Sequence, residues 1–328
     1  MTEESEKREL WVVCEPGRSA AEKDFLDLVS SVRRLADGFS ICAVVVDTPD
    51  LPHDSLSRAG ANRIYTLAVS CAQITPTGFA RAAAQAVATR TPAIFLMLAT
   101  TAGRSIAPRI AALLGTGLTA DCISLSIDRG ILLQTRPAFG GNLTADIVTQ
   151  GGGIQMATVR PYSLPPAGHI FSDKAPILQI GEIRGDDTMQ FGALLSLEST
   201  RNTFDTNVVI AGGVGIGGQA GFERLLYLSM LLNASLGASR AAVNAGYAAY
   251  PRQIGLTGCS ICPDLYLTFG ISGAVQHMAG VRRARRIIAV NTDPSAPIFR
   301  YADYGVIGDW AEVCEGLIAY FEAGGSHG

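Results

Sequence analysis

Short apolar runs alternate with amphipathic stretches along the first 115 residues. Phe25, Leu28, Val29 and Val32 recur at the spacing of one helix face. The apolar runs between such stretches have the length of buried strands. The predicted strands are 10–14, 40–47, 63–68 and 93–98, and the predicted helices are 25–36, 78–88 and 103–114. This alternation predicts a mostly parallel sheet covered by helices.

The pattern changes between residues 120 and 160. We expect antiparallel strands appended to the sheet, separated by glycine-containing turns. They are predicted at 122–127, 131–135, 143–148 and 154–159. Residues 161–176 are rich in Pro, Gly and Ser, which is typical of a linker. We therefore predict an N-terminal α/β domain over residues 1–200 and a C-terminal domain over residues 201–328.

The strand–helix pattern restarts in the C-terminal part. A predicted strand leads into a glycine-rich loop and a helix, and further strands precede a closing helix. These elements are 207–211, 212–221, 222–234, 265–270, 287–290 and 310–321. The order of elements predicts a Rossmann-like α/β domain.

Composition excludes several classes of protein. Hydrophobic residues make up 48% of the chain and charged residues 17%, so a large core is expected and disorder is not. The net charge of −3 argues against a protein built to bind nucleic acid. No apolar run is long enough for stable membrane insertion. The polar start, Met1 to Leu10, is unlike a signal peptide, and the odd count of seven cysteines is typical of reduced thiols, so we expect a cytoplasmic protein.

Cys259 and Cys262 form the one C-x-x-C pair of the chain. A zinc site would ordinarily need a second pair, and the four histidines do not lie at ligand spacing from this one. A redox or metal role stays open, but we expect two small residues in a loop.

Gly213, Gly215 and Gly218 fit the pattern G-x-G-x-x-G between a predicted strand and a predicted helix. Such a loop lets backbone N–H groups approach a pyrophosphate. The acidic residue expected about 20 residues further on in an NAD site is absent. A plain tight turn therefore explains these glycines as well as a ligand does.

Polar groups follow several predicted strand ends between Gly237 and Asp309. Each has a structural alternative: Ser239 and Ser272 as helix caps, His277 as a core histidine and Arg240 as an ion-pair partner. Together they predict a ligand crevice, because open α/β sheets bind ligands beyond their strand ends. The candidate site comprises Ser239, Arg240, Gln253, Ile254, Gly255, Thr257, Gly258, Gly270, Ser272, Gly273, Gln276, His277, Asn291 and Asp303.

Several longer strings match one family over nearly the whole chain. In the N-terminal part they are TTAGR (100–104), LGTGLTAD (114–121), QTRPAFGGN (134–142) and QMATVRP (155–161). In the C-terminal part they are GASRAAV (237–243), GISGAVQH (270–277), DPSAPIF (293–299) and ADYGVIGD (302–309). At these residues the chain resembles the alpha subunit of electron transfer flavoproteins.

The resemblance implies an FAD held mainly by the C-terminal domain. It also implies a heterodimer in which the N-terminal domain packs on a beta subunit. Such a protein accepts electrons from dehydrogenases, such as acyl-CoA dehydrogenases, and passes them on singly. An alternative within the family is an electron-bifurcating complex that oxidises NADH. Outside the family, a stand-alone NAD-dependent oxidoreductase and a binding or scaffolding protein remain as alternatives.

Site roles carry over from the resemblance by motif. Arg240 is expected beside the isoalloxazine ring, Thr257 near its N5 atom and His277 near its O2 atom. Ser239 and Ser272 are expected at the pyrophosphate, with Gln276 close by, and the adenosine end is expected at Asn291 and Asp303. The flavin carries the redox chemistry, so no catalytic nucleophile or acid–base residue is expected.

The chain departs from the family pattern at four positions. Val214 stands where the family usually has Arg, Leu256 where it has Gln, and Thr292 and Cys259 where it has Lys. These departures bear on individual contacts and on the flavin potential rather than on FAD binding itself.

Overall fold

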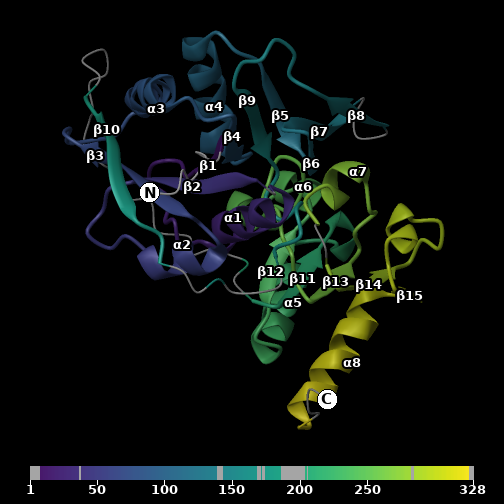
Figure 1. Cartoon of the computed structure of the whole chain (residues 1–328). Coiled ribbons are helices and arrows are strands. Elements are labelled where there is room, and N and C mark those ends of the chain that lie inside the picture. Colours follow the sequence, from purple (N-terminus) through teal and green to yellow (C-terminus); the bar gives the residue numbers. More distant parts are fainter. Residues whose placement is uncertain are drawn as a thin grey trace. The chain divides into compact units, whose positions relative to one another are not determined.

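The computed structural model describes residues 8–36, 38–138, 143–167, 171, 174–185, 204, 206–281 and 284–324. The chain forms two compact units, one within residues 1–192 and one within residues 193–328 (Figure 1). The predicted boundary between residues 200 and 201 lies outside the described residues and stays a prediction.

The first unit is built on a seven-stranded sheet in the order β10-β3-β2-β1-β4-β9-β5, in which all the pairings are parallel. The strands are β1 (Arg8–Val13), β2 (Phe39–Val46), β3 (Arg63–Val69), β4 (Ile94–Leu98), β5 (Leu118–Cys122), β9 (Gln155–Val159) and β10 (Ile177–Ile183). The helices of this unit are α1 (Lys23–Leu35), α2 (His53–Ala59), α3 (Pro76–Arg90) and α4 (Thr101–Leu114).

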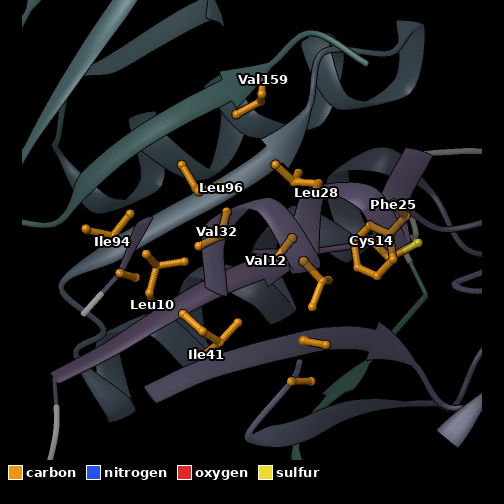
Figure 2. Close-up of a cluster of buried hydrophobic side chains, with 14 of the residues drawn as sticks. Leu10, Val12, Cys14, Phe25, Leu28, Val32, Ile41, Ile94, Leu96 and Val159 are labelled. Atoms are coloured by element: carbon orange, nitrogen blue, oxygen red, sulfur yellow. The ribbon is translucent and has the colours of Figure 1, made fainter. Parts of the chain in front are cut away.

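The central strand β1 is buried on both faces. Leu10 and Val12 belong to one core cluster with residues of α1, whereas Trp11 and Val13 belong to a second cluster with residues of α3 and α4. Figure 2 shows the first cluster, in which side chains of α1 pack against β1, β2 and β4. Burial on both faces explains why the sequence shows a continuous apolar run here instead of an alternating one.

Three of the four appended strands lie where they were predicted. β6 (Ser124–Asp128), β7 (Ile131–Ala138) and β8 (Leu143–Ile147) form a separate antiparallel sheet. The fourth prediction was wrong in its pairing, because β9 lies inside the main sheet, parallel to β4 and β5. A short apolar run predicts a strand but not the neighbouring strands with which it pairs.

The predicted linker over 161–176 is also wrong. Leu164, Ala167 and Ala175 are buried within the first unit, and β10 then pairs with β3 at the edge of the sheet. The described residues of this stretch have irregular backbone, and part of it is packed on the core of the first unit.

The second unit holds a five-stranded parallel sheet in the order β12-β11-β13-β14-β15. Its strands are β11 (Val208–Gly212), β12 (Ser235–Ala238), β13 (Leu265–Phe269), β14 (Arg286–Asn291) and β15 (Tyr304–Ile307). Its helices are α5 (Gln219–Leu231), α6 (Arg240–Asn244), α7 (Val275–Met278) and α8 (Trp310–Glu322). The α/β fold class, with parallel sheets and appended antiparallel strands, is confirmed.

The two faces of this second sheet are covered differently. Residues of α5 and α8 fill the core on one face. On the other face, the core is formed by Ile254, Ile261, Ile271 and Ile298 from irregular segments, together with Met278 of the short α7. Parts of these segments follow the carboxyl ends of the strands.

None of the helices within the described residues is sufficiently long and apolar to cross a membrane.

Candidate functional site

The parallel strands of the second unit bring several predicted site residues to one edge of its sheet. Ser239 follows β12, the glycine-rich loop 213–218 follows β11, the segment 270–277 follows β13 and Asn291 ends β14. The strand order reverses at β11, which has β12 on one side and β13 on the other. Ligands of open α/β sheets bind at such a switch point, outside the carboxyl ends of the strands.

The glycine-rich loop packs directly on the segment after β13. The Gly213 N–H donates to the Phe269 carbonyl at 2.8 Å and the Gly215 N–H to the Gly270 carbonyl at 3.3 Å. A Cβ atom at Gly213 would lie 2.0 Å from the Gly270 oxygen, so these two glycines serve loop packing. Gly218 faces open space and begins α5 without a side-chain cap, which leaves the first amides of α5 available.

The loop 253–258 is clamped between β12 and the segment after β13. The Ile254 N–H donates to the Ala238 carbonyl at 2.9 Å, and the Leu256 N–H donates to the Gln276 carbonyl at 2.7 Å. Gly255 has a φ of +143°, and a Cβ there would lie 2.9 Å from the Gln276 oxygen. The loop is therefore held in one conformation by backbone contacts.

Within this loop, Gln253 is buried and Thr257 is exposed. The Gln253 Nε2 donates to the Thr257 Oγ1 at 3.0 Å, which orients the hydroxyl group. The next residue is Gly258. A Cβ atom there would lie 2.2 Å from the Gln253 carbonyl oxygen, so the loop requires glycine at this position. Thr257 thus presents an oriented polar group to the surface of the unit.

The segment after β13 has its carbonyls tied and its amides free. The Ile271 carbonyl accepts from the Asn291 Nδ2 at 3.0 Å, and the Ser272 carbonyl accepts from the Ile298 N–H at 2.9 Å. The Gly270 and Gln276 carbonyls also accept hydrogen bonds from neighbouring loops. The amides of residues 271–276 donate to no described residue. Successive free N–H groups of this kind bind anions.

Ser239 makes a hydrogen bond within the protein, whereas the exposed Arg240 forms no ion pair among the described residues. Ser239 caps α6, its Oγ accepting from the Ala242 N–H at 3.3 Å, so the cap interpretation of this serine is confirmed. Arg240 is exposed and pairs with no acidic side chain among the described residues. Its guanidinium is therefore available to a ligand.

His277 is buried, with 7% of its surface exposed. Its Nε2 lies 2.7 Å from the hydroxyl of Tyr266, a residue of β13 that is fully buried. Burial lowers the pKa of His277 to about 4, and the nearby Ile254 carbonyl offsets this slightly. Its Nδ1 is buried without a partner in hydrogen-bond geometry. His277 is thus neutral near pH 7.

The structure does not bring Asp303 to the edge where the other site residues lie. Asp303 immediately precedes β15, and its carboxylate accepts from the Ile287 N–H at 2.8 Å near the start of β14. It also pairs with Arg286 at 3.4 Å. The sequence prediction placed it in a loop because β15 is only four residues long and exposed throughout, and was not predicted as a strand.

Asp309 occupies the position that the prediction gave to Asp303. It follows β15, caps α8 through the Ala311 N–H at 2.6 Å, and adjoins Gly308, whose N–H donates to the Asn291 carbonyl at 3.1 Å. A carboxylate directly after a strand was the available signal, but it required β15 to be predicted first.

The C-x-x-C pair is not arranged as a dithiol. Cys259 forms an isolated β-bridge with Ile254, and Ile261 forms one with Val281, which is typical of extended backbone. Residues three apart in extended chain are separated by about 10 Å, beyond the roughly 7 Å that a disulfide spans. Neither cysteine is in a disulfide within the described residues, and burial raises the pKa of Cys259. The prediction of two small loop residues fits this arrangement.

Comparison with known proteins identifies the family of this chain. Residues 10–182 match the family of the electron transfer flavoprotein domain, and residues 204–282 match the electron transfer flavoprotein FAD-binding domain. The chain belongs to the electron transfer flavoprotein alpha-subunit family.

Similar proteins match this chain over most of their length. The electron transfer flavoprotein subunit alpha of Thermoanaerobacterium thermosaccharolyticum is 36% identical, covering 95% of this chain and 97% of that protein. The subunit alpha of Clostridium acetobutylicum is 37% identical, covering 96% and 97%. Protein FixB of Bradyrhizobium diazoefficiens is 37% identical, covering 96% of this chain and 89% of that protein.

FAD is therefore the cofactor of this electron transfer flavoprotein subunit, as the resemblance implied. The described residues fit it. The free amides of 271–276 suit a pyrophosphate, the unpaired Arg240 suits an electron-rich ring, and the buried Nδ1 of His277 suits a carbonyl oxygen. As an alpha subunit, the chain also has a partner subunit.

Proposed function

We propose that this chain holds FAD in its second unit, within a heterodimer with a beta subunit. It accepts electrons from dehydrogenases, such as acyl-CoA dehydrogenases, and passes them on. The observation that carries this proposal is the row of free amides at 271–276, at the strand edge of a unit that matches the FAD-binding domain. When bound, FAD supplies reversible electron transfer at its isoalloxazine ring.

The pyrophosphate would lie on the free amides of residues 271–276. Ser272 and Gln276 are exposed there and add side-chain donors, while Gly270 and Gly273 let the segment pack closely on the backbone of Gly215 and Ile298. Gly273 has a φ of +80°, which turns the chain so that its carbonyls face the protein. The anion would be held by N–H groups, without a buried cation.

The flavin ring would lie between the loop 253–258 and Arg240. The guanidinium would stabilise the negative charge that the ring gains on reduction and so raise its potential. Thr257, oriented by Gln253, would donate near N5, and the buried ring of His277 would donate near O2. At Val214 an exposed apolar side chain adds no charge to this site.

The adenosine end would lie beyond β14 and β15. Asn291 is half-buried and braces the neighbouring backbone, donating to the Ile271 carbonyl and accepting from the Asp293 N–H at 3.0 Å. Asp309 stands beside it and offers a free carboxylate oxygen for a ribose hydroxyl. We therefore place Asp309, and not Asp303, in the binding site.

The first unit would pack on the beta subunit. In support, its antiparallel sheet exposes large apolar side chains, with Ile131 at 53% and Leu143 at 59% of their surface. Ile131 opposes Asp128 at one end of β7 and Leu143 opposes Ala138 at its other end, so both ends of this small sheet offer apolar side chains to a partner.

Anaerobic rapid mixing of the purified heterodimer tests the electron donor. We expect an acyl-CoA dehydrogenase with its acyl-CoA substrate to bleach the flavin, and NADH to leave it oxidised. Bleaching by NADH would favour the bifurcating alternative. If neither donor reduces a flavin that dithionite does reduce, then the proposed donor class is wrong. The partner subunit without this chain is the control.

A further inference from the structure

Tyr266 and His277 form an isolated polar pair in the apolar core of the second unit. The Tyr266 hydroxyl lies 2.7 Å from the His277 Nε2, and the two rings are stacked at 6.2 Å. Tyr266 is fully buried, and no other described residue bonds to its hydroxyl. The pair is surrounded by apolar side chains, among them Ile254 and Met278.

The position of the two hydrogens follows from what each group can bond. Burial raises the pKa of Tyr266 and lowers that of His277, so both are neutral. With the hydrogen on Nε2, the hydroxyl hydrogen would be buried and unpaired and the Nδ1 lone pair would face the Ile254 carbonyl; with the hydrogen on Nδ1, the hydroxyl donates to Nε2 and the N–H is directed toward that carbonyl. An unpaired buried donor costs about 1–3 kcal/mol. The neutral histidine then carries its hydrogen on Nδ1.

Nδ1 lies on the side of the ring toward the loop 253–258. The carbonyl of Ile254, in that loop, is close to it, but no described acceptor meets hydrogen-bond geometry. The backbone contact of Gly255 with residues 276 and 277 keeps the loop and the histidine together. The pair therefore holds one unused N–H donor beside the proposed flavin site.

We infer that Tyr266 is a positioning residue: it fixes His277 as a neutral Nδ1–H donor toward the carbonyl edge of the flavin. This inference rests on the proposed function for the identity of the acceptor, but not for the tautomer. Tyr266 touches no ligand and acts only through the histidine ring. It supplies the hydrogen bond that holds the ring in one tautomer and orientation, as partners of functional histidines generally do.

Nuclear magnetic resonance of the ring nitrogens tests the tautomer directly. The chain is labelled with ring-¹⁵N histidine, assembled with its unlabelled partner and measured at pH 7. It has four histidines, and His277→Asn identifies the relevant signals. We expect Nδ1 to be protonated and Nε2 to be unprotonated. A protonated Nε2, in either the other tautomer or the imidazolium, would overturn the inference.

Tyr266→Phe tests the positioning, because it removes only the hydroxyl. We expect about a tenfold rise in the FAD dissociation constant, the loss that corresponds to one buried hydrogen bond. The ¹⁵N signals of His277 should also show a mixture of tautomers. Tyr304→Phe is the control, since Tyr304 is 63% exposed on β15. If Tyr266→Phe leaves both readouts unchanged, the tyrosine does not position the histidine.

The two proposals fail separately. A complex without FAD but with the Nδ1–H tautomer would refute the flavin site and keep the inference about the histidine. A complex with FAD and a protonated Nε2 would do the reverse.

Discussion

Gly273→Ala is expected to disrupt the segment that carries the free amides. Gly273 has a φ of +80°, and a Cβ there would lie 2.4 Å from both the backbone nitrogen and the Cα of Ile298. Backbone atoms cannot move aside as a flexible side chain can. The substitution must therefore separate residues 270–277 from Ile298, whose N–H bonds to the Ser272 carbonyl.

The magnitude follows from two contributions. Placing alanine in the left-handed region costs roughly 1 kcal/mol. Overpacking against fixed backbone adds about 2 kcal/mol. Gly217→Ala is the matched control, because Gly217 has a φ of +81° with nothing within 4 Å of the added Cβ. It should incur the first cost alone.

Thermal unfolding of the heterodimer measures this difference. For a unit of this size, 1 kcal/mol corresponds to about 3 °C, so Gly273→Ala should unfold about 6 °C below Gly217→Ala. Flavin-free and FAD-saturated samples are compared, since ligand binding itself shifts the midpoint. Equal midpoints of the two variants in the flavin-free state would refute the close packing of residues 270–277 against Ile298.

Three further predictions concern the site. Asp309→Asn should raise the FAD dissociation constant about tenfold in fluorescence titrations, whereas Asp303→Asn should leave it unchanged; the reverse would restore Asp303 to the site. Arg240→Ala should lower the two-electron midpoint potential by about 30–60 mV in a spectroelectrochemical titration, with Arg240→Lys losing less, and an unchanged potential would remove the guanidinium from the ring. The pKa of His277 is lowered from 6.5 to about 4, so as the pH falls the unfolded state takes up a proton at this residue before the folded state does. Stability should thus fall as pH decreases from about 6.5 to about 4, by up to about 3 kcal/mol in urea unfolding, and His277→Gln should abolish that part of the slope.

Much of the fold could be predicted from local pattern. The apolar run at β1 predicts a strand, because a strand buried on both faces has apolar residues at successive positions. The spacing of Phe25, Leu28 and Val32 predicts α1, because a helix buried along one face has apolar residues every three or four positions. Gly115 ends α4 in the left-handed conformation, directly after the predicted helix 103–114.

Other parts could not be predicted, because their partners are distant in sequence. The pairing of β9 with β4 and β5, and the return of β10 to β3, depend on contacts that periodicity does not encode. The strand β15 is only four residues long and exposed throughout, so a loop was predicted there and Asp303 was predicted to lie in that loop. The hydrogen bond of Tyr266 to His277 joins a strand to a short helix, and only the structure reveals it.

The amount and kind of flavin in the purified heterodimer test the central claim most directly. The flavin is released by denaturation and counted, after the visible spectrum has been recorded with and without NADH. We predict one FAD per heterodimer and a spectrum that NADH leaves unchanged. A second FAD bleached by NADH would indicate a bifurcating complex, and a heterodimer that neither contains nor takes up FAD would contradict the account.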